Sequence, residues 1–99
     1  MLNKARKLSI IIPIYNEVRT VKKVFKKIDS MVLDGFEKQV IVIDDFSNDG
    51  TREYLMELKN KKPNYTFLFH KSNFGKGRAI KKSLPYVNGD NVALIDADE

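Results

Sequence analysis

The sequence contains no cysteine, and this absence excludes a disulfide scaffold and any thiolate metal site. Such a chain is compatible with a reducing cytoplasm. No apolar run approaches the roughly 20 residues that a helix needs to cross a bilayer. The basic start of the chain is followed by a short apolar stretch that Pro13, Asn16 and Glu17 interrupt, so it does not resemble a signal peptide.

The familiar phosphate-binding loops are also absent. Gly75, Lys76 and Gly77 do not form a P-loop, because no Ser or Thr follows the lysine and the earlier glycine of that motif is missing. They do not form the Gly-x-Gly-x-x-Gly of dinucleotide folds either. Where those folds carry glycines after the first strand, this chain has residues 13–17, PIYNE. The sequence therefore argues against a nicotinamide-dependent or ATP-hydrolysing enzyme.

Acidic residues are the minority charge, with 13 Asp and Glu against 18 Lys and Arg and a formal net charge of +5. A basic balance suits nucleic acid, an anionic membrane or a phosphorylated substrate. However, much of it lies on the polar side of one predicted helix, which favours a solvated helix face over a dedicated anion site. We expect no nucleic acid partner, and a basic α/β nucleic-acid-binding domain stays the weaker alternative. The basic residues of that helix are Arg19, Lys22, Lys23, Lys26 and Lys27.

Apolar, β-branched runs alternate with segments of helical spacing, without linkers or repeats. Strands are predicted over residues 8–12, 40–43, 65–69 and 91–95, and helices over residues 16–32, 51–59 and 78–84. Pro13 is expected to end the first strand and Asn16 to cap the first helix, which should stop at Asp34 and Gly35. The alternation predicts an α/β fold over residues 1–99, a Rossmann-like, mostly parallel sheet with helices on both faces.

Carboxylates follow three of these strands. Because the carboxyl ends of parallel strands meet at one edge, where such folds bind ligands, we expect the acids to gather there. Two carboxylates about 4 Å apart repel by on the order of 4 kcal/mol at an effective dielectric near 20. The cluster therefore predicts a bound cation or a hydrogen-bonding ligand. The six acids are Glu17, Asp44, Asp45, Asp96, Asp98 and Glu99.

Four segments, in this order and at these strand ends, resemble family 2 glycosyltransferases of the GT-A fold. The nearest branch is the dolichol-phosphate mannose synthase-like, polyprenyl-phosphate group. The resemblance covers essentially the whole chain, but only the N-terminal half of a complete GT-A domain. It implies inverting, metal-dependent sugar transfer from a UDP- or GDP-sugar donor to a lipid-phosphate or saccharide acceptor. The segments are residues 9–17, 42–51, 73–79 and 96–98.

The resemblance implies that the first two segments bind the nucleotide-sugar donor. Pro13, Tyr15 and Glu17 match the first nucleotide-contacting loop, with the Tyr ring near the base and the Glu carboxylate at a ribose hydroxyl. Core packing of the Tyr and a place in the first helical turn for the Glu stay open as alternatives. Asp44 and Asp45 match the acidic pair that accepts from a pyrimidine imide. Residues 47–51 favour turn and cap structure.

The last two segments match the diphosphate and metal end of the donor site. Lys76 lies in the loop that supports the phosphates, and Asp96 and Asp98 match the family's Asp-x-Asp metal ligands for Mg²⁺ or Mn²⁺. Asp96 is also expected to contact the donor. His70 is expected to be structural. Phe46 stands where the family commonly has Gly, and the catalytic base is expected beyond residue 99.

The resemblance also implies what this chain does by itself. As a donor-binding half it should have little transferase activity, and its fourth strand should lie at an open sheet border through which copies self-associate. A cytoplasmic location is expected, at the inner face of a membrane if further segments anchor it. A catalytically idle nucleotide-binding module stays an alternative. A phosphoacceptor receiver domain is disfavoured, because its acidic pair should follow the first strand.

Overall fold

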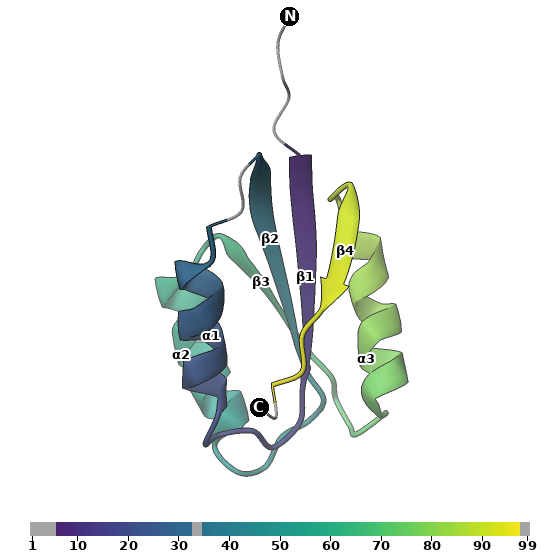
Figure 1. Cartoon of the computed structure of the whole chain (residues 1–99). Coiled ribbons are helices and arrows are strands. Elements are labelled where there is room, and N and C mark those ends of the chain that lie inside the picture. The colour runs from purple at the N-terminus through teal and green to yellow at the C-terminus, as the bar shows by residue number, and fades with distance from the viewer. Residues whose placement is uncertain (1–5, 33–34, 98–99) are drawn as a thin grey trace, which may run out of the picture.

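A computed structural model describes residues 6–32 and 35–97, which form a four-stranded parallel sheet between two layers of helix (Figure 1). The alternation of strand and helix and the parallel pairing confirm the predicted α/β class. The elements are β1 (Arg6–Ile14), α1 (Val21–Ser30), β2 (Phe36–Asp44), α2 (Thr51–Lys61), β3 (Tyr65–Phe69), α3 (Lys76–Ser83), a 3₁₀ turn (Leu84–Tyr86) and β4 (Asn91–Leu94).

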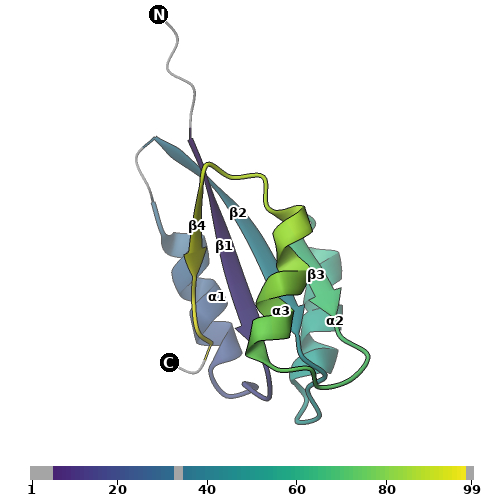
Figure 2. The same ribbon diagram turned by 90° about the vertical axis from the view of Figure 1, so that its right-hand side faces the viewer.

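The strand order across the sheet is β3-β2-β1-β4, which Figure 2 shows from right to left. The chain steps outward from β1 to β2 to β3 and then returns to the other side of β1 for β4. Strand order therefore reverses between β1 and β4, where open parallel sheets bind ligands. Within the described part of the chain β4 is an edge strand, as predicted.

The two faces of the sheet bury separate cores, because β1 and β2 are covered on both sides. Alternate residues of β1 point to opposite faces. Ile10, Ile12 and Ile14 face α1 and α2, where Val21, Val24, Phe25, Ile28 and Leu55 are buried against them. Ile11 faces α3 together with Ile41, Ile43 and Ala79. These apolar contacts fix the ends of β1 and β2 at the edge that holds the site.

The prediction that Pro13 ends the first strand was wrong, since β1 continues to Ile14. Ile11 directs its carbonyl toward β4, where it accepts from the N–H of Ile95 at 3.0 Å. Pro13, two residues further on, directs its nitrogen to the same side. Within the described residues, pairing between these strands stops at Leu94, opposite Ile11, so no neighbouring strand needs the N–H that proline lacks.

The predicted start of the first helix was also wrong. Helix α1 begins at Val21 with Thr20 as its N-cap, and Asn16 lies four residues earlier with a φ of +52°, in the left-handed region. Its side-chain oxygen instead accepts from the N–H of Asn48 at 2.8 Å. The helix ends at Ser30, before the predicted stop, whose residue Asp34 lies outside the described residues. Asn16 thus joins two loops.

Candidate functional site

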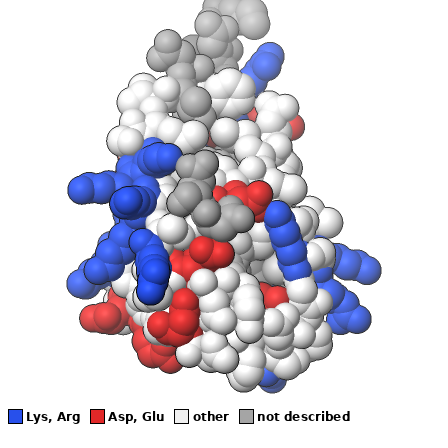
Figure 3. All heavy atoms as spheres, turned by 60° about the horizontal axis from the view of Figure 1, so that its bottom comes forward, with Lys and Arg blue, Asp and Glu red and all other residues white. Residues whose placement is uncertain are grey.

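A cavity of about 160 Å³ lies at the carboxyl ends of β1, β2 and β4, where strand order reverses. Figure 3 shows acidic side chains in the middle of this edge of the molecule, with Lys and Arg side chains on both flanks. Of the residues predicted to bind the donor, all but Asp44 line the cavity. The lining residues are Pro13, Ile14, Tyr15, Glu17, Asp45, Lys76, Ala79, Asp96 and Ala97.

The loop after β1 supplies one wall of the cavity. The Tyr15 side chain is 43% exposed, so the alternative that it packs in the core was wrong. Glu17 lies ahead of α1 rather than in its first turn, and its carbonyl accepts from the N–H of Thr20 at 3.1 Å. Both side chains are therefore available to a ligand in the cavity.

This loop is held by the turn that precedes α2. Three successive backbone N–H groups, those of residues 16, 17 and 18, donate to side chains of residues 47–51. These side chains support the loop after β1, whereas the predicted capping role was wrong, because the N-cap of α2 is Gly50 and no side chain of the described residues caps the helix. The acceptors are Ser47 Oγ at 2.9 Å, Thr51 Oγ1 at 3.0 Å and Asp49 Oδ2 at 3.3 Å, in that order.

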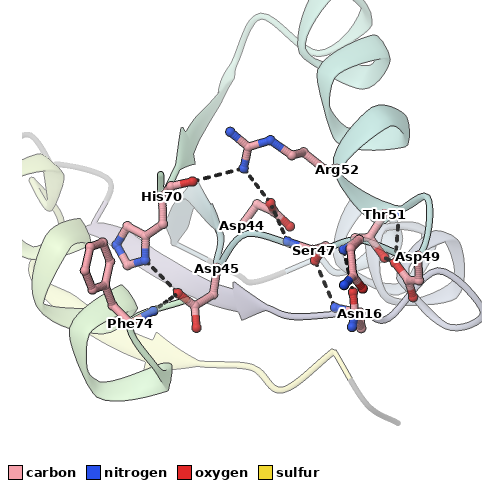
Figure 4. A network of polar contacts seen from close by, with 10 residues as sticks. Asn16, Asp44, Asp45, Ser47, Asp49, Thr51, Arg52, His70 and Phe74 are labelled. Carbon is pink, nitrogen blue, oxygen red and sulfur yellow. Dashed lines mark hydrogen bonds and ion pairs between the residues drawn. The ribbon is translucent and has the colours of Figure 1, made fainter. Parts of the chain in front are cut away.

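Asp45 lines the cavity with its carboxylate fixed by three groups (Figure 4). Oδ1 lies 2.8 Å from Nδ1 of His70 and accepts from the N–H of Phe74 at 2.9 Å. Oδ2 accepts from the N–H of Gly75 at 2.8 Å. Burial raises the pKa of Asp45, but these hydrogen bonds outweigh it and hold the pKa below the usual value. Asp45 is thus an ionised acceptor at neutral pH.

The structure does not bring Asp44 to the cavity. Neighbouring residues of an extended segment point to opposite sides, and Figure 4 shows the carboxylates of Asp44 and Asp45 doing so. Asp44 is fully buried, and its Oδ2 accepts from Arg52 at 2.9 Å and from the N–H of Ser47 at 3.1 Å. Its Oδ1 has no hydrogen-bond partner within the described residues. This geometry makes Asp44 a support for the site and not a wall of the cavity.

Sequence reasoning assigned no chemistry to His70 and did not single out Arg52. The register of β2 with β3 pairs Asp44 with Phe69, so the next residues, Asp45 and His70, follow side by side. The adjacency of two strand ends is the signal that would have found this pair. Arg52 donates both to Asp44 and to the carbonyl of His70, the latter at 3.1 Å, and so joins the two strand ends.

Lys76 and Asp96 form an ion pair across the mouth of the cavity. The side chains are 58% and 56% exposed, so solvent reaches both. Gly75, with a φ of +94°, turns the chain so that α3 begins at Lys76. On the other side, the Thr20 hydroxyl donates to the carbonyl of Ala97, which holds the segment after β4 against the start of α1.

The predicted metal site is only partly covered by the structure. Asp98 lies outside the described residues, and among residues 6–32 and 35–97 no group of three or more His, Cys, Asp or Glu is placed to hold a metal ion. Asp96 offers hard carboxylate oxygens of the kind that Mg²⁺ and Mn²⁺ prefer. In the described part of the chain, no helix has the length and apolarity needed to cross a membrane.

Curated relatives match most of this chain. It is 35% identical over 92 residues to a dolichol-phosphate mannosyltransferase of Pyrococcus furiosus, covering 93% of this chain and 26% of the relative. It is 30% identical over 97 residues to a dolichyl-phosphate beta-glucosyltransferase of Trichomonas vaginalis, covering 92% of this chain and 30% of the relative. The chain thus spans less than a third of the length of these relatives.

Solved structures agree with this result. A mannosyltransferase from Pyrobaculum calidifontis in complex with GDP-Man and Mn²⁺ matches with a TM-score of 0.77 and 26% identity, over 92% of this chain and 27% of that one. S. aureus TarS in complex with UDP-GlcNAc matches with a TM-score of 0.76 and 26% identity, over 93% and 26%. The family model for glycosyl transferase family 2 matches residues 9–99. This chain therefore belongs to glycosyl transferase family 2.

Proposed function

We propose that this chain is the donor-binding part of an inverting, metal-dependent glycosyltransferase. The enzyme would take a sugar from a UDP- or GDP-linked donor and pass it to a lipid phosphate or a saccharide. The observation that carries this proposal is the convergence of six predicted donor-binding residues, from the ends of three strands and the start of α3, on one cavity. The relatives named for transfer to dolichol phosphate support the acceptor class.

The base and ribose of the donor would bind between the ends of β1 and β2. The exposed ring of Tyr15 suits stacking against a base. The ionised carboxylate of Asp45 suits an N–H group of the base, and the carboxylate of Glu17 suits a ribose hydroxyl. All three side chains lie on the cavity.

The diphosphate would bind at the mouth, near Lys76 and Asp96. Lys76 is paired with Asp96 here, so an incoming diphosphate would compete for its ammonium group. Asp96, together with Asp98, would hold Mg²⁺ or Mn²⁺, which would act as a Lewis acid and offset charge on the departing diphosphate. Neighbours with GDP-Man and Mn²⁺ and with UDP-GlcNAc support a nucleotide-sugar donor. Inversion also needs a general base or an anionic acceptor, and we expect the base from residues beyond 99.

Calorimetry of UDP and GDP, each with and without Mn²⁺, tests the proposal on this chain. We expect at least one nucleotide to bind, more tightly with Mn²⁺, and Asp96→Asn to weaken binding about tenfold or more, as loss of a charged partner does. Glu57→Gln, at an exposed position on α2, is the matched control. Failure of a folded chain to bind either nucleotide would contradict the proposal. Ordinary turnover by this chain alone would contradict its limitation to donor binding.

A further inference from the structure

The carboxylate of Asp45 has little acceptor capacity left for a ligand. Two carboxylate oxygens offer about four lone-pair positions. Two donors, Nδ1 of His70 and the N–H of Phe74, reach Oδ1, and the N–H of Gly75 reaches Oδ2. Because an ionised carboxylate can only accept, Nδ1 of His70 must carry its hydrogen toward Asp45. About one acceptor position therefore remains, on Oδ2.

This arrangement is held in place from several sides. His70 is 4% exposed, its ring packs edge-on against Phe74 at 5.1 Å between centroids, and Arg52 donates to its carbonyl. The N–H groups of Phe74 and Gly75 belong to the segment that leads into α3. Rotation of the Asp45 carboxylate would leave the buried Nδ1 of His70 without its acceptor, which is costly. A ligand must therefore bind to the carboxylate in this fixed orientation.

Nucleobases differ in the number of donors that they present to such a group. Uracil presents a single imide N–H between two carbonyl oxygens. Guanine presents a ring N–H beside an exocyclic amino group, and this pair calls for both oxygens of a carboxylate. A carboxylate with one free acceptor position matches uracil and leaves a guanine donor unpaired.

Resting on the proposed function, we propose that the site is specific for uridine nucleotides and that His70 determines this specificity. His70 acts as a positioning residue: it occupies Oδ1 of Asp45 and leaves Oδ2 to take the uracil imide. The ligand class is thus a UDP-linked donor in preference to a GDP-linked one.

A nucleotide series on the unaltered chain tests the ligand class without any variant. In calorimetry with Mn²⁺, we expect UDP to bind at least tenfold more tightly than GDP and than N3-methyl-UDP, which keeps the diphosphate but lacks the imide N–H. A smaller UDP preference over either compound overturns the inference while the proposed function stands. If none of the three binds, the proposed function itself fails.

Two substitutions then test the role of His70. His70→Leu removes one of the two donors to Oδ1, which frees an acceptor position on each oxygen, and should reduce the UDP preference over GDP to about threefold or less. His70→Asn, whose amide can donate from near the position of Nδ1, should retain the preference, as should the control Lys71→Gln at an exposed neighbouring position. Equal weakening of both nucleotides in His70→Leu would mean a merely structural role and would overturn the assignment.

A measurement on the carboxyl group itself keeps the test independent of nucleotide affinity. Since hydrogen bonds to the ionised form lower a carboxyl pKa, we expect the NMR-detected pKa of Asp45 to rise in His70→Leu and to stay near its wild-type value in His70→Asn. Circular dichroism reports whether each variant is folded. An unchanged pKa of Asp45 in folded His70→Leu would overturn the positioning role.

Discussion

Arg52 Nη1 lies 2.9 Å from Oδ2 of Asp44, a carboxylate with no exposed surface at the end of β2. The guanidinium also packs near the Phe69 ring, 5.0 Å from its centroid, and donates to the carbonyl of His70. One side chain of α2 thus neutralises a buried charge and ties together the two strand ends beside the cavity. Breaking a buried pair costs more than replacing both members, because the remaining charge is left without a partner.

We therefore expect Arg52→Ala to lower the free energy of unfolding by about 3 kcal/mol, measured by urea denaturation. The double variant Asp44→Asn/Arg52→Met should be less destabilised than Arg52→Ala, because it leaves no charge unpaired. Arg6→Ala, at an exposed position near the other end of the sheet, serves as the control. Equal stability of the two Arg52 variants would contradict a charge-pairing role.

Phe46 offers a second prediction, because its φ of +66° lies in the region that favours glycine. The ring is 46% exposed and lies 5.6 Å from the guanidinium carbon of Arg52. A non-glycine residue in this left-handed conformation is destabilised by about 1–2 kcal/mol. Phe46→Gly should be more stable than Phe46→Ala by about 1 kcal/mol in thermal or urea unfolding.

The two Phe46 variants are matched, since both remove the ring and only the alanine keeps the unfavourable backbone. An alanine variant as stable as the glycine variant would show that residue 46 leaves the left-handed region when the ring is removed.

Stability should fall in acid because of Asp45. Its pKa is held below the ordinary value of 3.8, since the hydrogen bonds from His70, Phe74 and Gly75 outweigh burial. A depressed carboxyl pKa stabilises the fold above the unfolded pKa and ceases to do so as the pH falls through the folded value. We expect the free energy of unfolding of wild type to decrease from about pH 4 downward.

Asp45→Asn should flatten part of this decrease, because an amide does not titrate. The variant will keep some acid sensitivity, because two other carboxyl groups also have lowered pKa values. Hydrogen bonds from Lys62 and Tyr65 outweigh the effect of burial on the pKa of Asp29. Hydrogen bonds from Thr51 do the same for the pKa of Asp49. An Asp45→Asn profile that is parallel to wild type at every pH would count against the depressed pKa.

The border strand β4 leads to a fourth prediction. Val92 and Leu94 are 50% and 54% exposed, and one side of the strand is unpaired within the described residues. Exposed, apolar edge strands pair with other chains. We expect light scattering to show concentration-dependent dimers of this chain, which Leu94→Lys abolishes. Met56→Lys, at an exposed apolar position on α2, should leave dimerisation unchanged. A monomer at millimolar concentration would contradict the prediction.

The layered fold followed from the sequence because its signals are local. Residues 40–43 and 8–12 are apolar without interruption, which indicates strands covered on both faces, and the spacing of Val21, Val24, Phe25 and Ile28 indicates one buried helix face. Pro13 was misjudged because its tolerance depends on where a neighbouring strand ends. That information is not local.

The candidate site was predictable as a set of strand ends but not as a set of contacts. Asp44 and Asp45 were taken together, although the period of an extended chain already separates their side chains. His70 was expected to be structural and was given no place in the site, because its contact with Asp45, 25 residues away, depends on the β2–β3 register. Asn16 was expected to cap a helix, but its φ of +52° makes it a left-handed loop residue, and its side chain accepts from the distant Asn48.

Three hydrogen bonds join the loop at residues 16–18 to the segment at residues 47–51, so the positions of the two loops depend on each other. A change in Thr51, which is fully buried and does not itself line the cavity, would shift Glu17 through the main chain. The shape of the proposed donor site can therefore be altered by a residue that does not line the cavity. A variant that changes one of these loops therefore needs a matching change in the other to keep the shape of this wall of the cavity.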